Sequence, residues 1–182
     1  MNNFLVVGSS GQIGTALMRT CHERSIAATG LDMRPNLWNS KLTDIQIDFL
    51  DYKPATASNV TDIVFLATNP SARELEKNSL QNEKDYKAFH HAKRCAMMVG
   101  ARLSIVSSRE LFGTEQAKVA SFTAQTVYEK QKKDFESELY ALQTDGYHTG
   151  VLRTPIVFGG YDTDTERIPR MVPRWCKQVL LG

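Results

Sequence analysis

The feature that most constrains this chain is a glycine-rich turn between a short apolar strand and a helix. Residues 4–7 form an apolar run, and the next seven residues read Gly8-Ser9-Ser10-Gly11-Gln12-Ile13-Gly14. A strand that leads through glycines into a helix presents backbone N–H groups and the positive end of the helix dipole to a pyrophosphate. Glycine turns also occur in helix-capping loops that bind nothing, so this interpretation depends on the residues around the turn.

Those surrounding residues favour a dinucleotide site. Gly8 can take the tight turn, Gly11 lets the backbone approach the phosphates, and Gly14 lets the helix lie close to the strand. Asp32 ends the second apolar run, twenty-one residues after Gly11. A carboxylate at that position can accept hydrogen bonds from the hydroxyls of the adenosine ribose. Strand, turn, helix and acid, in this order, predict that the chain binds a dinucleotide.

Apolar runs alternate with helical stretches along the chain, and this order predicts the fold class. The expected strands are 4–7, 26–31, 44–47, 62–66, 102–107 and 149–157, and the expected helices are 13–23, 78–99 and 123–142. Turn residues typical of hairpins do not separate the strands, so right-handed crossovers and a parallel sheet follow. The sequence therefore predicts an α/β protein with a Rossmann-type, doubly wound parallel sheet.

Composition and charge exclude several other classes of protein. The 182 residues are 42% hydrophobic and 23% charged, which suits one soluble domain. The net charge is only +2 and no basic stripe is present, so we expect no nucleic-acid partner. No apolar stretch is long enough to cross a membrane. Three widely spaced cysteines favour reduced thiols, so we expect a cytoplasmic protein. Adjacent histidines point in different directions on a helix and chelate a metal poorly, so we expect no metal site.

A second group of polar residues follows the fifth expected strand. Ser108 and Glu110 lie at its carboxyl end, where ligands bind in open α/β sheets. Tyr128 and Lys132 are four positions apart, so they share one face of a helix, and the cation favours a phenolate that can exchange a proton near neutral pH. A surface tyrosine on a charged helix shows the same spacing. Together with the serine and the glycine turn, the pair predicts a nicotinamide-dependent site.

With these motifs the chain resembles the extended short-chain dehydrogenase/reductase family, and within it the NAD-dependent epimerase/dehydratase group that acts on nucleotide sugars. The resemblance covers nearly the whole sequence. It is carried by Gly8-x-x-Gly11-x-x-Gly14, Asp32, Asp48-Phe49, Leu66-Ala67, Ser108 with Phe112-Gly113, Tyr128 with Lys132, and Leu152-Arg153-Thr154-Pro155 leading to Val157-Phe158-Gly159. It implies a reaction in which a sugar carbinol loses a hydride to the nicotinamide and a proton to Tyr128, giving a transient keto sugar.

The resemblance also implies roles for individual residues. Ser108, Tyr128 and Lys132 would form the catalytic set, and Lys132 would also bind the nicotinamide ribose. Glu110 falls where sugar-nucleotide 4,6-dehydratases keep the base that removes the C5 proton, although it could instead point at solvent or pair with Arg109. The cofactor-binding residues would be Gly8, Ser10, Gly11, Gln12, Ile13, Gly14, Asp32, Asp48, Phe49, Leu66, Ala67, Tyr128 and Lys132.

Expectations for the cofactor and the domains follow from the same comparison. Asp32 would repel the 2′-phosphate of NADP, so NAD is the expected cofactor; Arg34 would offset this only if its side chain turned inward. Residues 1–158 are expected to form the NAD(P)-binding Rossmann domain, and residues 159–182 a loop and a helix that begin the substrate-binding portion. Relatives carry a further C-terminal portion, most of which is absent here. Their long helices form a dimer face, so the resemblance makes a homodimer possible, although nothing in the residues themselves demonstrates it.

Two functions of different classes stay open from the sequence. One is an enzyme that epimerises, dehydrates or reduces a nucleotide-activated sugar with NAD. The other is a non-catalytic NAD(P)-binding module, or a truncated form, that senses the cofactor or pairs with a partner protein. The retained Tyr128–Lys132 pair favours the enzyme, whereas the short C-terminal portion favours the module.

Overall fold

The computed structural model describes residues 3–55, 59–69, 71–111, 116–155 and 157. Within them, six parallel strands form one sheet in the order β3-β2-β1-β4-β5-β6. The direction in which strands are added reverses between β1 and β4, which confirms the predicted Rossmann-type, doubly wound sheet. The strands are β1 (Asn3–Val7), β2 (Ala27–Asp32), β3 (Ile45–Gln46), β4 (Asp62–Phe65), β5 (Arg102–Ser108) and β6 (Thr149–Thr154).

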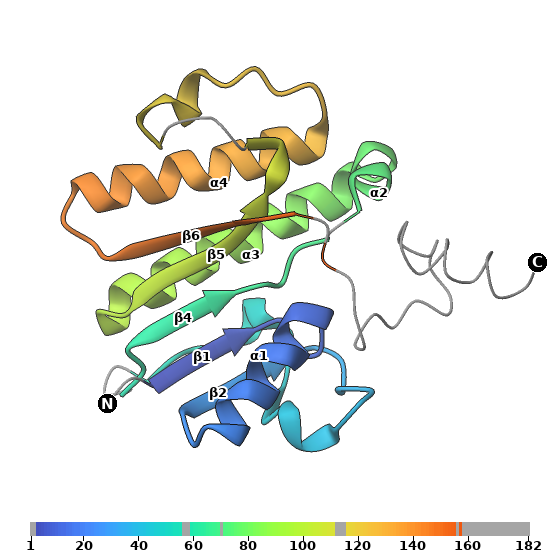
Figure 1. The fold of residues 1–182 in the computed structure, drawn as a ribbon, viewed down its shortest axis with the longest axis vertical. Helices are drawn as coiled ribbons and strands as arrows, with labels where there is room; N and C mark the ends of the chain where they lie inside the picture. The colour runs from blue at the N-terminus through green and yellow to red at the C-terminus, as the bar shows by residue number, and fades with distance from the viewer. Residues whose placement is uncertain (1–2, 56–58, 70, 112–115, 156, 158–182) are drawn as a thin grey trace, which may run out of the picture.

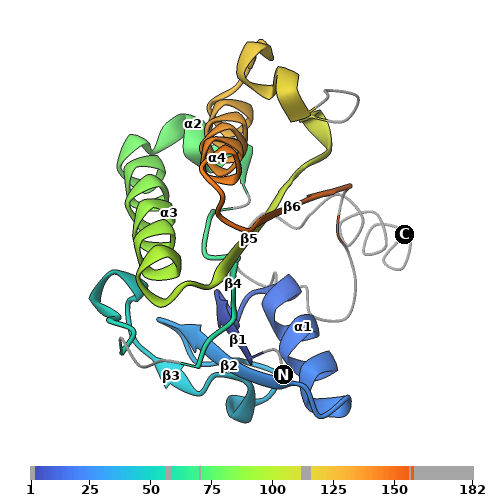
Figure 2. The same ribbon diagram turned by 90° about the vertical axis from the view of Figure 1, so that its left-hand side faces the viewer.

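Helices cover both faces of this sheet. Helix α1 lies on one face, and the long helices α3 and α4 lie side by side on the other (Figures 1 and 2). All neighbouring strands are parallel, so their carboxyl ends meet at one edge of the sheet. The helices are α1 (Gln12–Glu23), α2 (Ala72–Lys77), α3 (Ser79–Val99) and α4 (Val127–Thr144), with 3₁₀ turns η1 (Ser40–Leu42), η2 (Phe49–Asp51), η3 (Arg109–Leu111) and η4 (Gln116–Ser121).

The structure differs most from the sequence expectation in three places, while the other strand and α-helix boundaries shift by at most two residues. Helix α2 was not expected, because six residues are too few to show a helical period. Strand β6 ends at Thr154 instead of reaching residue 157, because Pro155 has no N–H to donate to the sheet. Helix α4 begins at Val127, four residues late, because Thr126 caps it. The expected loop and helix of residues 159–182 lie outside the described residues.

The main hydrophobic core fills the space between the sheet and helices α3 and α4. Its aromatic centre is a stack of Phe89 from α3 on Phe135 from α4, with ring centroids 4.1 Å apart, and Phe65 from β4 packs beside Phe89. A smaller cluster lies under α1, where Val6 contacts Met18. The strands read as continuous apolar runs because both faces of the sheet are covered.

The part of the chain that the structure describes contains no disulfide, no membrane-spanning helix and no cluster of metal-ligating side chains. Cys21 and Cys95 are buried and form no disulfide. No described helix is both long enough and apolar enough to cross a membrane. No three His, Cys, Asp or Glu side chains among the described residues are grouped so that they could hold a metal ion.

Candidate functional site

The glycine turn is wedged between the carboxyl ends of β2 and β4. Gly8 has φ of +91°, and a Cβ built on it would lie 2.9 Å from the backbone of Leu66 and Ala67. A Cβ on Gly14 would lie 2.1 Å from the carbonyl oxygen of Gly8. The backbone N–H of Gly8 donates to the carbonyl of Leu31 at 2.8 Å. These contacts leave no room for side chains on Gly8 and Gly14, and Leu66 and Ala67 lie against the turn.

The amino end of helix α1 carries no internal cap. Its N-cap residue, Gly11, has no side chain that could accept from the first turn, and no acidic residue lies in that turn. The first turn comprises Gln12, Ile13 and Gly14, which places all three predicted residues at this helix end. An anion at this end would be favoured by the helix dipole. The turn and the uncapped helix end therefore fit a pyrophosphate.

Asp32 joins the glycine turn to the loop that follows β2. Its carboxylate is 7% exposed; Oδ2 accepts from the N–H of Ser10 at 3.0 Å, and Oδ1 accepts from the N–H of Arg34 at 3.0 Å. The guanidinium of Arg34 lies 3.7 Å away and is 60% exposed. A carboxylate has acceptor capacity beyond two hydrogen bonds, so Asp32 can still receive a ribose hydroxyl. This side of the site fits NAD.

Asp48 and Phe49 lie after β3 and differ in their surroundings. Asp48 is exposed, and its Oδ1 accepts from the N–H of Leu50 at 3.0 Å, so it caps the turn η2. Phe49 is 5% exposed and packs on Phe65 and Tyr52 in the main core. The side chain of Asp48 is therefore available to an adenine, whereas that of Phe49 is part of the core.

Ser108 is the last residue of β5, and its hydroxyl is directed at Glu110. Ser108 is 5% exposed and donates from Oγ to Oε2 of Glu110. The other carboxylate oxygen of Glu110 lies 3.5 Å from Nε of Arg109. Glu110 thus both pairs with Arg109 and faces Ser108, instead of pointing only at solvent. The structure brings two of the predicted catalytic residues together.

Lys132 is buried at the carboxyl edge of the sheet and lies against Tyr128. Its Nζ donates to Oγ1 of Thr68 at 3.2 Å and to the carbonyl of Val106 at 3.4 Å, and it lies 5.5 Å from the centroid of the Tyr128 ring. Burial lowers the pKa of Lys132 to about 8, although the negative charge of Asp85 opposes the shift. The ammonium therefore titrates close to neutral pH beside the phenol that it is expected to activate.

Two residues of this region were missed by the sequence reasoning. Thr68 follows β4 and holds Lys132; a hydroxyl just beyond Leu66-Ala67, at a strand end, was a usable signal. Asp85 is 3% exposed on α3, and its carboxylate accepts from the N–H of Asn69 at 2.9 Å and from Nε2 of Gln131 at 3.2 Å. Nothing local marks Asp85, since a carboxylate within a helix is usually solvated.

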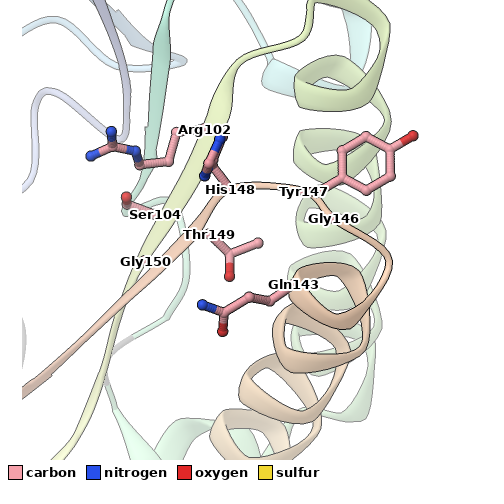
Figure 3. Close-up of a pocket in the computed structure, with 8 residues that line it drawn as sticks. All are labelled: Arg102, Ser104, Gln143, Gly146, Tyr147, His148, Thr149 and Gly150. Atoms are coloured by element: carbon pink, nitrogen blue, oxygen red, sulfur yellow. The ribbon is translucent and has the colours of Figure 1, made fainter.

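A surface cavity of about 520 Å³ lies at the opposite edge of the sheet. It is formed by the amino ends of β5 and β6 and the carboxyl end of α4 (Figure 3). Figure 3 shows Arg102 and Tyr147 pointing to opposite sides, and Nε of Arg102 already lies 3.5 Å from a carboxylate oxygen of Asp62. The polar side chains that line this cavity do not point toward one another, so we assign the candidate site to the carboxyl edge of the sheet and not to this cavity.

The fold has many solved counterparts. UDP-glucose 4-epimerase from Thermotoga maritima superposes with a TM-score of 0.81 and 18% identity, covering 99% of this chain and 63% of that one. An NAD-dependent NDP-hexosamine 5,6-dehydratase of tunicamycin biosynthesis has a TM-score of 0.74 and 22% identity, covering 99% of this chain and 62% of that one. UDP-N-acetylglucosamine 4-epimerase from Methanobrevibacter ruminantium has a TM-score of 0.75 and 19% identity, covering 100% of this chain and 63% of that one. This chain thus spans less than two thirds of their length. At these identities the likeness shows the fold alone.

The sequence itself gives the family. None of the curated proteins compared with this chain matches it. A family model does match, over residues 4–182, and it describes the NAD dependent epimerase/dehydratase family. NAD, the expected cofactor, is the cofactor of that family. Because the match spans almost the whole sequence, the chain belongs to the NAD dependent epimerase/dehydratase family.

Proposed function

We propose that this chain acts on a nucleotide-activated sugar, with NAD, by hydride transfer through a keto-sugar intermediate. The observation that carries the proposal is the position of Lys132, a buried cation against the ring of Tyr128 at the sheet edge that also holds the glycine turn. Solved structures with this fold include UDP-glucose and UDP-N-acetylglucosamine 4-epimerases, which supports a nucleotide-sugar substrate.

Each of the three catalytic side chains has a role that its surroundings support. Bound NAD supplies the hydride acceptor. Tyr128, as phenolate, takes the proton of the sugar hydroxyl that is oxidised, and the ammonium of Lys132 stabilises the phenolate because Lys132 is itself buried beside the ring. Ser108 donates from its hydroxyl to the oxygen that becomes the keto group, once it releases Glu110.

Glu110 decides which reaction follows the oxidation. If it turns from Ser108 to the sugar, it can remove the C5 proton and pass it to the C6 hydroxyl, which leaves as water; the hydride then returns to C6, and the product is a dehydrated sugar. If it stays on Ser108, as in the structure, it only orients that hydroxyl, and the keto sugar is reduced again on either face. We propose the epimerase reaction as the first to test, because the observed contact keeps the carboxylate on Ser108.

The test is a single-turnover experiment with the 182-residue chain, NAD⁺ and a panel of UDP-sugars. We expect reduced nicotinamide absorbance to appear on addition of the right sugar and to be lost in Tyr128→Phe. Calorimetric titration of NAD⁺ into both proteins is the control, because the variant should bind NAD⁺ as the parent does. Undiminished turnover in Tyr128→Phe would refute the catalytic assignment. NAD⁺ binding without turnover on any sugar would favour the non-catalytic module.

A further inference from the structure

A buried ion pair links helix α4 to strand β6, next to the candidate site. Glu136 is 0% exposed, and the side chain of Arg153 is 16% exposed. The guanidinium donates in a two-pronged manner, with Nη2 at 2.7 Å from Oε2 and Nε at 3.1 Å from Oε1 of Glu136. This planar fork is the geometry in which arginine binds a carboxylate most specifically.

The same guanidinium has a third contact, with the segment that follows Ser108. Nη1 of Arg153 donates to the carbonyl oxygen of Leu111 at 2.6 Å. Leu111 is fully buried and ends the turn η3, which begins directly after Ser108. One side chain therefore ties together α4, β6 and the segment that carries Ser108 and Glu110. We call Arg153, Glu136 and the Leu111 carbonyl the arginine clamp.

The clamp lies on the catalytic face of α4. Tyr128, Lys132 and Glu136 follow one another at intervals of four residues, so they lie along the same side of the helix. The contact of Glu136 with Arg153 is therefore one turn from Lys132 and two turns from Tyr128. A shift of η3 relative to α4 at the clamp would change the position of Ser108 relative to the phenol.

A stabilising role alone does not account for this arrangement. The desolvation of two buried charges largely offsets their attraction, and well-packed apolar residues are often as good or better. What the fork adds is a fixed geometry, because five donors on a rigid plane meet acceptors from two separate elements.

We propose that the arginine clamp is a positioning device, which sets Ser108 and Glu110 at the correct distance from Tyr128 and Lys132. Neither Arg153 nor Glu136 is a catalytic residue in this account, since each acts through η3 or α4. This inference rests on the proposed function for its effect on turnover, but its effect on η3 can be measured without any substrate.

The substrate-free measurement is limited proteolysis with trypsin after Arg109. Arg109 lies in η3 and its side chain is 53% exposed, so cleavage there depends on how firmly η3 is held. Arg153→Lys keeps a cation for Glu136 but loses the fork, and we expect cleavage after Arg109 roughly ten times faster. Arg102→Lys is the matched control, because Arg102 pairs with Asp62 at the opposite edge of the sheet.

The second measurement is single-turnover reduction of NAD⁺ by the sugar. A displacement of about 1 Å can slow a reaction about a hundredfold, so we expect Arg153→Lys to slow turnover roughly ten- to hundredfold. Half-saturation by NAD⁺ and by sugar should stay within about twofold, because the binding surfaces are not altered. Glu136→Gln should likewise slow turnover and leave both half-saturation values within about twofold. It provides a second test if Arg153→Lys folds poorly.

The outcomes separate the two proposals. Unchanged cleavage after Arg109 in both clamp variants would overturn the clamp, as would faster cleavage at all sites, which indicates global destabilisation. If the parent shows no turnover, or if Tyr128→Phe retains it, the proposed function fails while the cleavage result still decides the clamp. Faster cleavage at Arg109 alone, with slower turnover and unchanged half-saturation, supports both.

Discussion

The candidate site has two halves: the first is the glycine turn with Asp32, and the second is the group of Ser108, Tyr128 and Lys132. Helix α1 begins at the first half and helix α4 at the second, and the two helices begin in opposite ways. Gly11 precedes α1 and offers no side-chain cap, whereas Thr126 precedes α4 in a closed capping box with Glu129. The end of α1 is left for an anion, while the end of α4 is satisfied within the protein. We therefore expect the first half to bind its ligand with backbone groups, and the helix end in the second half only to position side chains.

This difference extends to what holds each half together. Around the glycine turn, the constraint is steric and comes from atoms such as the Gly8 carbonyl, six residues from Gly14. Around Lys132, the partners are distant in sequence: Thr68 is 64 positions away, and Val106 is 26. The first half, which is built from closely packed backbone, should therefore lose stability and NAD⁺ binding when a side chain is added to a glycine. The second half, which contains a buried charge, should make the stability of the protein depend on pH.

The largest effect should come from Lys132 and should depend on pH. Its pKa is about 8 in the folded protein against 10.5 ordinarily, so between pH 8 and 10.5 the unfolded chain binds more protons. Lys132 should therefore raise the free energy of unfolding by about 3 kcal/mol as the pH rises across that window. Below pH 8 its contribution should not change with pH. Lys132→Met should lack this rise in urea unfolding at pH 7 and pH 10.

The parent and Lys132→Met share every other group that titrates at high pH, so the comparison is the difference between their two pH responses. At pH 7 the variant should be the more stable protein, because it no longer buries an ammonium. Equal pH responses would contradict a buried lysine with a lowered pKa and would weaken the contrast between the halves.

The next effect is steric and belongs to the first half. Gly14→Ala places a Cβ 2.1 Å from the Gly8 carbonyl oxygen, so the turn must shift. We expect a loss of roughly 1–3 kcal/mol in the free energy of unfolding, together with loss of NAD⁺ binding, measured by urea titration and calorimetry. Gly11→Ala is the control for stability alone, because its Cβ would lie 3.3 Å from the same oxygen. Equal losses of stability in the two variants would contradict the steric account.

A smaller effect should come from the buried carboxylate behind Lys132. Asp85→Asn removes a negative charge that raises the pKa of Lys132, so that pKa should fall below about 8, as followed by NMR of the lysine side chain. The free energy of unfolding should fall by roughly 1.5 kcal/mol, because Asn69 and Gln131 lose a charged acceptor.

Helix α3 also offers a matched control for Asp85. Glu83 forms an ion pair with Lys87, and both side chains are more than half exposed. Glu83→Gln should change neither the lysine pKa nor the stability measurably, because exposed pairs contribute little. An unchanged Lys132 pKa in Asp85→Asn would show that Asp85 does not raise it, which would leave burial and the charge of Glu136 as its causes.

The same contrast explains how much of this protein the sequence predicts. The glycine turn, Asp32 and the order of strands are local patterns, and the structure has them at the predicted places. Asp85 could not be predicted in this way, because only the packing of α3 on α4 brings it to Lys132. Pro155 was visible in the sequence, and its missing N–H should have ended the expected last strand at Thr154.

The smallest effect tests whether a local signal in the second half matters for the site. Thr126→Ala removes the hydroxyl that accepts from the N–H of Glu129 at 3.1 Å, and should lower the free energy of unfolding by about 1 kcal/mol. Tyr128 is the second residue of α4, so fraying of this turn would displace the phenol. Thr126→Ser keeps the hydroxyl and should match the parent in both stability and turnover. If Thr126→Ala loses stability but keeps full turnover, the phenol is held by its packing against Lys132 and not by the helix end. The position of the phenol would then depend on the contacts, distant in sequence, that hold Lys132.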